Sequence, residues 1–146
     1  MSETCGTKIE LEATLGNYES FMTFIESHLA DILVDTKKMK VLTACEEIII
    51  NIINYAYPDT KGTLEITFEK KLQGITITFV DSGRRFNPLA NPDTDITLSI
   101  EERKIGGLGI FMVKKLMDDI SYEYNENKNR VTVTKHLHEK SNEPEK

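Results

Sequence analysis

A narrow polar stripe on an apolar helical segment is the first feature of the sequence that could do chemistry. Glu47, Asn51 and Asn54 lie within about 60° of one another at helical spacing, and isoleucines occupy most of the remaining circumference. Such a stripe faces either solvent or a polar cavity. In a cavity, the amide oxygen of Asn51 is a suitable ligand for Mg2+. The Glu47 carboxylate, one turn away, could then accept a proton from an attacking hydroxyl.

A carboxylate followed closely by a glycine is the second feature. Asp81 and Gly83 come at the end of an alternating, β-branched run. Ordinary turn chemistry explains this pattern. A carboxylate at the tip of a strand, beside backbone that lacks a Cβ atom, is also suited to accept a hydrogen bond from the amino group of a base. Arg84 and Arg85 follow, either as solvated loop residues or as phosphate contacts.

A glycine cluster at the start of a helical pattern is the third feature. Gly106, Gly107 and Gly109 surround Leu108. Glycines at this point allow a ligand to approach the backbone, and the free N–H groups and the helix dipole favour phosphate. The cluster lacks the lysine and hydroxyl residue of a Walker P-loop, and its spacing differs from the dinucleotide-binding pattern. By itself it is therefore a weak signal.

Hydrophobic periodicity predicts the elements that must position these residues. We expect strands over 7–13, 63–72, 74–80, 120–124 and 130–136, helices over 17–34 and 38–56, a long loop over 87–104, and a third helix that opens at the glycine cluster. Asn17 is expected to cap the first helix, and residues 125–129 to connect the last two strands. The predicted fold is α+β, a two-layer sandwich in which helices cover one face of a mixed, mostly antiparallel sheet. Residues 1–136 are expected to form a single domain, and 137–146 a charged, disordered tail.

Length and composition restrict the classes of function. The 146 residues carry 18 Lys plus Arg against 24 Asp plus Glu, a formal charge of −6. This charge argues against direct binding to nucleic acid or anionic lipid. We expect neither a secretory signal nor a membrane span, and hence a cytoplasmic protein. Cys5 and Cys45 lack metal-ligand spacing. Phe21 and Phe24 belong either to the core or to a subunit interface.

The order and separation of three segments, 47–57, 81–88 and 106–118, resemble those of the GHKL, or Bergerat-fold, ATPases. Within them the chain is similar to the bacterial anti-sigma factor serine/threonine kinases, over about residues 9–136. The resemblance implies a Bergerat ATP-binding fold with ATP and Mg2+ as cofactors. It also implies the following roles: Glu47 as the catalytic base, Asn51 as the metal ligand, Asp81 as the acceptor for the adenine amino group, Gly83 as the point where the base approaches, Gly106, Gly107, Leu108 and Gly109 as the phosphate-binding loop, and 87–105 as the ATP lid. Asn54 departs from the family pattern, because histidine kinases commonly carry lysine there. We expect Asn54 and Arg85 to be further nucleotide contacts, with Arg85 compensating for the missing lysine.

The resemblance also implies partners. In this family the phosphate acceptor is a serine or threonine of a STAS-type anti-anti-sigma protein, and the kinase binds a sigma factor as a homodimer. The leading hypothesis is therefore a serine/threonine protein kinase that regulates a sigma factor by partner switching. A nucleotide-gated binding module with negligible phosphotransfer is one alternative. A histidine kinase domain, suggested by His28, is another, although a lone histidine on a surface helix is the simpler reading.

Overall fold

The computed structural model describes residues 5–90 and 107–137 of the chain. Its elements, in chain order, are β1 (Cys5–Glu12), the 3-10 helix η1 (Leu15–Asn17), α1 (Tyr18–Leu29), α2 (Asp35–Tyr55), β2 (Thr63–Lys70), β3 (Gly74–Asp81), the 3-10 helix η2 (Pro88–Ala90), α3 (Gly107–Leu116), β4 (Asp119–Asn125) and β5 (Lys128–His136). No helix within these ranges combines the length and the apolar composition that crossing a bilayer requires. The expected tail begins at residue 137, so all but its first residue lies outside the described chain, and the domain boundary stays a prediction.

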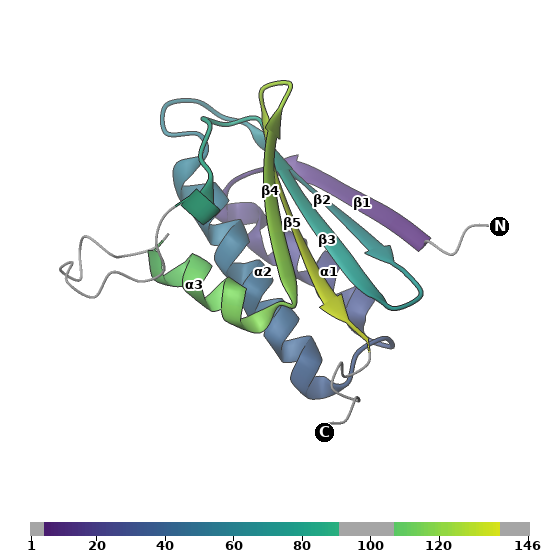
Figure 1. Ribbon diagram of the computed structural model, residues 1–146. Coiled ribbons are helices and arrows are strands. Elements are labelled where there is room, and N and C mark those ends of the chain that lie inside the picture. Colours follow the sequence, from purple (N-terminus) through teal and green to yellow (C-terminus); the bar gives the residue numbers. More distant parts are fainter. Residues whose placement is uncertain (1–4, 91–106, 138–146) are drawn as a thin grey trace.

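The described strands form one sheet in the order β1-β2-β3-β5-β4, and each pair of neighbours is antiparallel. All three α-helices lie on one face of this sheet, with α2 between α1 and α3 (Figure 1). The expected two-layer α+β sandwich with a mostly antiparallel sheet is thereby confirmed. The parallel pairing implied by a mixed sheet does not occur among the described strands. Strands β2 and β3 follow one another in the chain, as do β4 and β5, and a short turn joins each antiparallel pair. Each pair is therefore a hairpin.

The core lies between the sheet and the helices. Alternate residues of β2 and β3 point toward the helices and are fully or almost fully buried: Leu64, Ile66, Phe68, Ile75, Ile77 and Phe79. From α2, Ile48, Ile49 and Ile52 are buried against them. Phe21 of α1 is completely buried, so it belongs to the core. Each such side chain contributes roughly 1.5–3 kcal/mol, and together they hold α2 in one orientation on the sheet.

The first helix is shorter than its hydrophobic pattern predicts. It ends at Leu29 instead of continuing to residue 34, because the backbone turns there and the N–H groups of Ile32 and Leu33 donate to the Leu29 carbonyl. Val34 is extended and precedes α2. Asn17 stands at the N-cap position of α1, but its side chain donates to the Glu12 carbonyl and makes no capping hydrogen bond. The apolar residues at helical spacing therefore extend past the end of α1 into the turn that links it to α2, and for this reason the predicted helix was too long.

The last hairpin has a tighter turn than predicted. Strand β4 extends to Asn125 and β5 begins at Lys128, so the turn comprises two residues instead of the expected segment 125–129. Glu126 and Asn127 have φ values of 55° and 64°. Positive φ at both positions is typical of the two-residue turn that fits the twist of a hairpin. As a consequence, Asn129 lies within β5, opposite Asp81 of β3.

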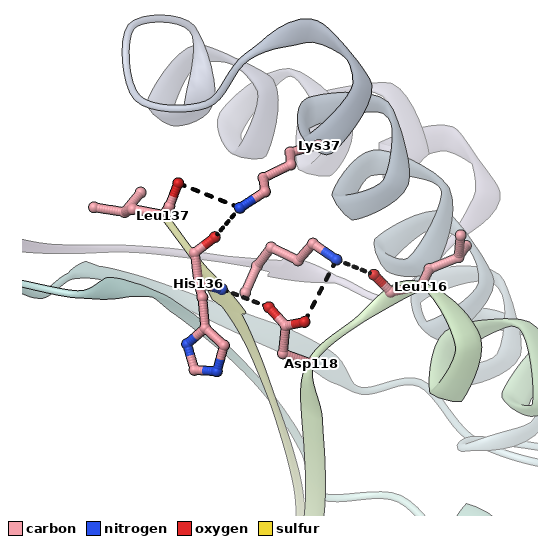
Figure 2. Close-up of polar contacts among 6 residues, drawn as sticks. Lys37, Leu116, Asp118, His136 and Leu137 are labelled. Carbon is pink, nitrogen blue, oxygen red and sulfur yellow. Dashed lines mark hydrogen bonds and ion pairs between the residues drawn. The ribbon is translucent and has the colours of Figure 1, made fainter. Parts of the chain in front are cut away.

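A polar network holds the end of β5 to two helices (Figure 2). The ammonium group of Lys135, which is only 7% exposed, donates to the Leu116 carbonyl at the end of α3 (2.7 Å) and lies 3.8 Å from a carboxylate oxygen of Asp118. The other oxygen of Asp118 accepts the His136 N–H at 2.6 Å. The ammonium group of Lys37, in α2, donates to the carbonyls of His136 and Leu137, at 2.9 and 3.2 Å. This network fixes the end of α3 opposite its glycine-containing start.

Replacing the buried lysine tests the contribution of this network. Lys135→Met keeps most of the apolar stem but leaves the Leu116 carbonyl and the Asp118 carboxylate without the ammonium group. We expect the free energy of unfolding to fall by roughly 1–3 kcal/mol, as measured by chemical denaturation. Lys128→Met is the matched control, because Lys128 is an exposed residue of the same strand and should change stability by less than about 0.5 kcal/mol. Equal effects of the two substitutions would contradict a stabilising role for the network.

Candidate functional site

A cavity lies where the second half of α2 meets the end of β3 and the start of β5. Its lining residues are Ile48, Asn51, Ile52, Tyr55, Ala56, Asp81, Arg84, Phe86, Pro88, Asn129 and Val131. Two of the residues singled out in the sequence, Asn51 and Asp81, therefore face the same cavity although they come from different elements. Their lining neighbours are mostly apolar, so the two polar groups lie in surroundings of low polarity.

Asn51 is buried, at 9% exposure, on the face of α2 that carries Ile48 and Ile52. Its amide oxygen, Oδ1, is the one buried side-chain polar atom without a hydrogen-bond partner in the part of the chain that the structure describes. Leaving such a group unpaired costs about 1–3 kcal/mol, and native proteins rarely leave buried polar atoms unpaired. An unpaired amide oxygen that faces a cavity is therefore the arrangement expected of a ligand-binding group.

Asp81 ends β3 and is also buried, at 6% exposure. Its Oδ1 atom accepts the Gly83 N–H at 2.8 Å and the Asn129 Nδ2–H at 3.0 Å. Its Oδ2 atom accepts no hydrogen bond from the described residues. Burial raises the pKa of the Asp81 carboxyl, and the two hydrogen bonds offset part of this rise. One carboxylate oxygen is thus held in place while the other is available to a donor in the cavity.

Asn129, which the predicted turn over 125–129 included, holds the carboxylate from within β5. Its Nδ2 donates to Asp81 and to the Arg84 carbonyl (2.9 Å), and its Oδ1 accepts the Tyr122 hydroxyl (2.6 Å) and the Phe86 N–H (3.1 Å). These bonds use both donors and both acceptor positions of the amide. The sequence did contain a signal, because the buried alternation of β5 begins at Asn129. Assigning this residue to the connecting turn concealed that signal.

Gly83 packs directly against the end of α2. A Cβ atom at this position would lie 2.2 Å from the carbonyl oxygen of Ala56, and no side chain tolerates such a contact. The next residue, Arg84, donates its N–H to the same carbonyl at 2.9 Å. Glycine is therefore needed here for packing within the protein. The expected role of Gly83 in admitting a base stays a prediction.

Glu47, Asn54 and Arg85 do not line the cavity. Glu47 is half-buried one helical turn before Asn51, a rise of about 6 Å along α2. Burial, and then the nearby charge of Glu46, raise the pKa of the Glu47 carboxyl. Asn54 is exposed. The guanidinium of Arg85 lies 4.7 Å from the centre of the Tyr124 ring, a cation–π contact, whereas Arg84 faces the cavity.

The glycine cluster lies at the start of α3. The helix begins at Gly107 and includes Leu108 and Gly109, and α3 packs along α2 (Figure 1). Gly106 and residues 91–105 of the expected lid lie outside the described residues. The expected opening of a helix within the cluster is therefore present, while the expected phosphate contacts stay a prediction.

His28 has a structural explanation. Its ring centre lies 4.6 Å from that of Phe24 and 5.1 Å from that of Phe68, and its Nδ1 is 2.7 Å from the Phe24 carbonyl oxygen. It does not line the cavity. These contacts account for a histidine on α1 without a phosphate-accepting role.

Comparisons with known proteins agree with this architecture. Residues 11–135 match the model of a family described as the histidine kinase-like ATPase domain. The chain is 24% identical over 97 residues to the serine/threonine-protein kinase BtrW of Bordetella bronchiseptica, covering 65% of this chain and 68% of that protein. It is 30% identical over 112 residues to the serine-protein kinase RsbW of Bacillus thuringiensis, covering 70% of this chain and 65% of that protein.

The fold is also similar to a solved structure, that of the RsbU and RsbW domains of Rv1364c from Mycobacterium tuberculosis. The TM-score is 0.63 at 16% sequence identity, and the match covers 91% of this chain but only 32% of the mycobacterial one. The chain thus spans about two thirds of the curated kinases and a third of the solved protein. Because the family model extends over most of its length, the chain belongs to the histidine kinase-like ATPase domain family, the GHKL ATPases.

Proposed function

We propose that this protein is an ATP-dependent serine/threonine protein kinase of the anti-sigma factor type. The observation that carries the proposal is the shared cavity in which the Asn51 amide oxygen has no partner and the Asp81 carboxylate keeps one oxygen available. A metal ligand and an acceptor for an amino group are the two groups that recognition of a metal-bound adenine nucleotide requires. The names of the relatives support the kinase activity, since BtrW and RsbW are both described as protein kinases.

Each residue has a defined role in this proposal. Asp81 Oδ2 accepts the adenine amino group, and Gly83 lies beside the base. Asn51 Oδ1 is a hard oxygen ligand that suits Mg2+. Mg2+ usually keeps several waters and shares its other positions with substrate phosphates, so a single amide oxygen would suffice as the protein ligand. Mg2+ and ATP, when bound, supply the phosphoryl group and neutralise its charge.

The remaining residues act on the phosphates and on the acceptor. The backbone amides of residues 106–109 bind phosphate oxygens at the start of α3, and Asn54 and Arg85 provide further contacts from exposed positions. Glu47 accepts the proton of the attacking hydroxyl. Its raised pKa brings the carboxylate closer to the operating pH, which suits a general base.

The partners in this proposal follow from the resemblance to anti-sigma kinases. The acceptor is a serine or threonine on a STAS-type anti-anti-sigma protein, a sigma factor is the second partner, and the kinase acts as a homodimer. The net charge of −6 argues against direct contact with nucleic acid or an anionic membrane. Regulation would therefore depend on contacts between proteins.

Nucleotide binding is the first test. Mg-ATP and Mg-ADP at about a hundred times Kd should stabilise the protein by roughly 2.7 kcal/mol, which raises Tm by roughly 5–10 °C for a chain of this size. Thermal denaturation measures this shift. Chelation of Mg2+ and Asn51→Ala should each reduce the shift strongly. A shift that is identical with and without Mg2+ would remove Asn51 from the metal site.

Asp81→Asn should affect stability and binding in opposite directions. Burial raises the pKa of Asp81 in the folded protein, so its carboxylate disfavours the folded state as the pH rises through this pKa. Without nucleotide, the variant should be more stable than the wild type at pH 7. This advantage should disappear below the unfolded-state pKa of an aspartate, about 3.9. ATP affinity should fall by roughly 10- to 100-fold, because an amide nitrogen now faces the base. Unchanged ATP affinity would contradict the assignment of Asp81.

Phosphotransfer tests the base. Glu47→Gln should lower the rate of transfer from labelled ATP to a STAS partner by at least about 100-fold with nucleotide binding retained. Glu46→Gln is the matched control. Removing its charge lowers the pKa of Glu47, so transfer should persist and the acid limb of the pH–rate profile should move to lower pH.

Other outcomes of the transfer experiment identify the alternatives. Transfer that survives Glu47→Gln would exclude Glu47 as the base. Nucleotide binding without any labelled partner would favour the nucleotide-gated binding module. An acid-labile phosphoprotein would favour a histidine kinase.

A further inference from the structure

Tyr57 connects three segments that meet beside the cavity. It follows α2 by two residues, and its hydroxyl accepts the Ser82 N–H at 2.8 Å while donating to the Thr63 carbonyl at 2.7 Å. A tyrosine hydroxyl has one hydrogen to donate, and that hydrogen is used by Thr63. The end of α2 and the start of β2 are thereby joined to residues 81–84, which we call the Asp81 turn.

The position of the Tyr57 ring is determined by the glycine across from it. A Cβ atom at Gly62 would lie 2.0 Å from Cε1 of the Tyr57 ring, so only glycine allows the ring to lie there. Burial raises the pKa of Tyr57, and the charge of Asp81 contributes to the rise. The hydrogen bond from the Ser82 N–H to the Tyr57 hydroxyl places the hydroxyl next to the residue that follows Asp81.

The Asp81 turn is attached to α2 at a second point. Arg84 donates its N–H to the Ala56 carbonyl, and Gly83 packs against the same residue. Within the turn, Gly83 also donates its N–H to the Asp81 carboxylate. The direction of that carboxylate thus depends on how residues 56 and 57 hold the turn, and both residues follow the helix that carries Asn51.

We propose that Tyr57 is a positioning residue for base selectivity: its hydroxyl holds the Asp81 turn so that the available carboxylate oxygen meets the amino group of adenine. This inference rests on the proposed function. Tyr57 does not line the cavity, so it acts through Asp81 and not by touching the nucleotide. Loss of its hydroxyl should therefore impair recognition of the amino group while leaving recognition of the phosphates intact.

Tyr57→Phe tests this proposal, because it removes the hydroxyl and keeps the ring beside Gly62. Affinity is measured for ATP and for inosine triphosphate, which carries a carbonyl in place of the amino group. We expect the Kd for ATP to rise roughly three- to tenfold, the range that corresponds to one hydrogen bond, and the Kd for inosine triphosphate to change by less than about twofold. Gly62→Ala, which displaces the ring, should reproduce this selective loss.

The matched control is Thr63→Val. It removes the hydrogen bond from the Thr63 hydroxyl to Glu10, 3.1 Å long, and keeps the carbonyl that Tyr57 uses. Its stability loss should be comparable to that of Tyr57→Phe, but its ratio of ATP to inosine triphosphate affinity should equal that of the wild type. If Tyr57→Phe weakens the binding of ATP and of inosine triphosphate by the same factor, the ratio of the two affinities is unchanged and Tyr57 has no role in selectivity.

A measurement without nucleotide separates this inference from the proposed function. The Gly83 N–H is held by Asp81, so loosening the turn in Tyr57→Phe should speed its hydrogen exchange by about tenfold, with no change in Thr63→Val. Unchanged exchange at Gly83 would overturn the positioning role. A wild-type protein that binds neither nucleotide would instead refute the proposed function, and the selectivity claim with it.

Discussion

An amide oxygen that is buried without a hydrogen-bond partner is the constraint on which the site depends. Asn51 cannot bring its side chain to water by rotating α2, because Ile48 and Ile52 on the same helix are packed into the core. The burial of these side chains offsets the cost of about 1–3 kcal/mol that an unpaired carbonyl imposes. A ligand at Asn51 removes this cost, so stability and binding are linked at one atom.

The carboxylate side of the cavity is organised by hydrogen bonds. Asn129 and Gly83 hold one oxygen of Asp81, while Ala56 and Tyr57 hold the backbone of the turn that follows. Burial raises the pKa of Asp81, so the folded protein keeps an acceptor in surroundings that disfavour its charge. Groups oriented before a ligand arrives lose less entropy on binding. The packing that buries Asp81 thus disfavours its charged form and also fixes the direction of its carboxylate.

Much of the fold was predictable from local pattern. Alternation predicted the strands, and the apolar spacing of the isoleucines predicted α2, because one face of each element must be buried. Apolar spacing failed where the chain turns between α1 and α2 and where Glu126 and Asn127 form the last turn. The spacing of apolar residues indicates which side chains can be buried, but it does not indicate where the backbone turns.

For the site, the sequence by itself determined which groups are chemically suited to a nucleotide: the amide of Asn51, the carboxylate of Asp81 and the glycines at the start of α3. Only the tertiary structure decided that the first two face one cavity, that Asn54 does not, and that Asn129 and Tyr57 hold the Asp81 turn. The physical reason is that hydrogen bonds between segments distant in the chain depend on strand register and helix packing. These are properties of the whole core, and no local pattern of residues specifies them.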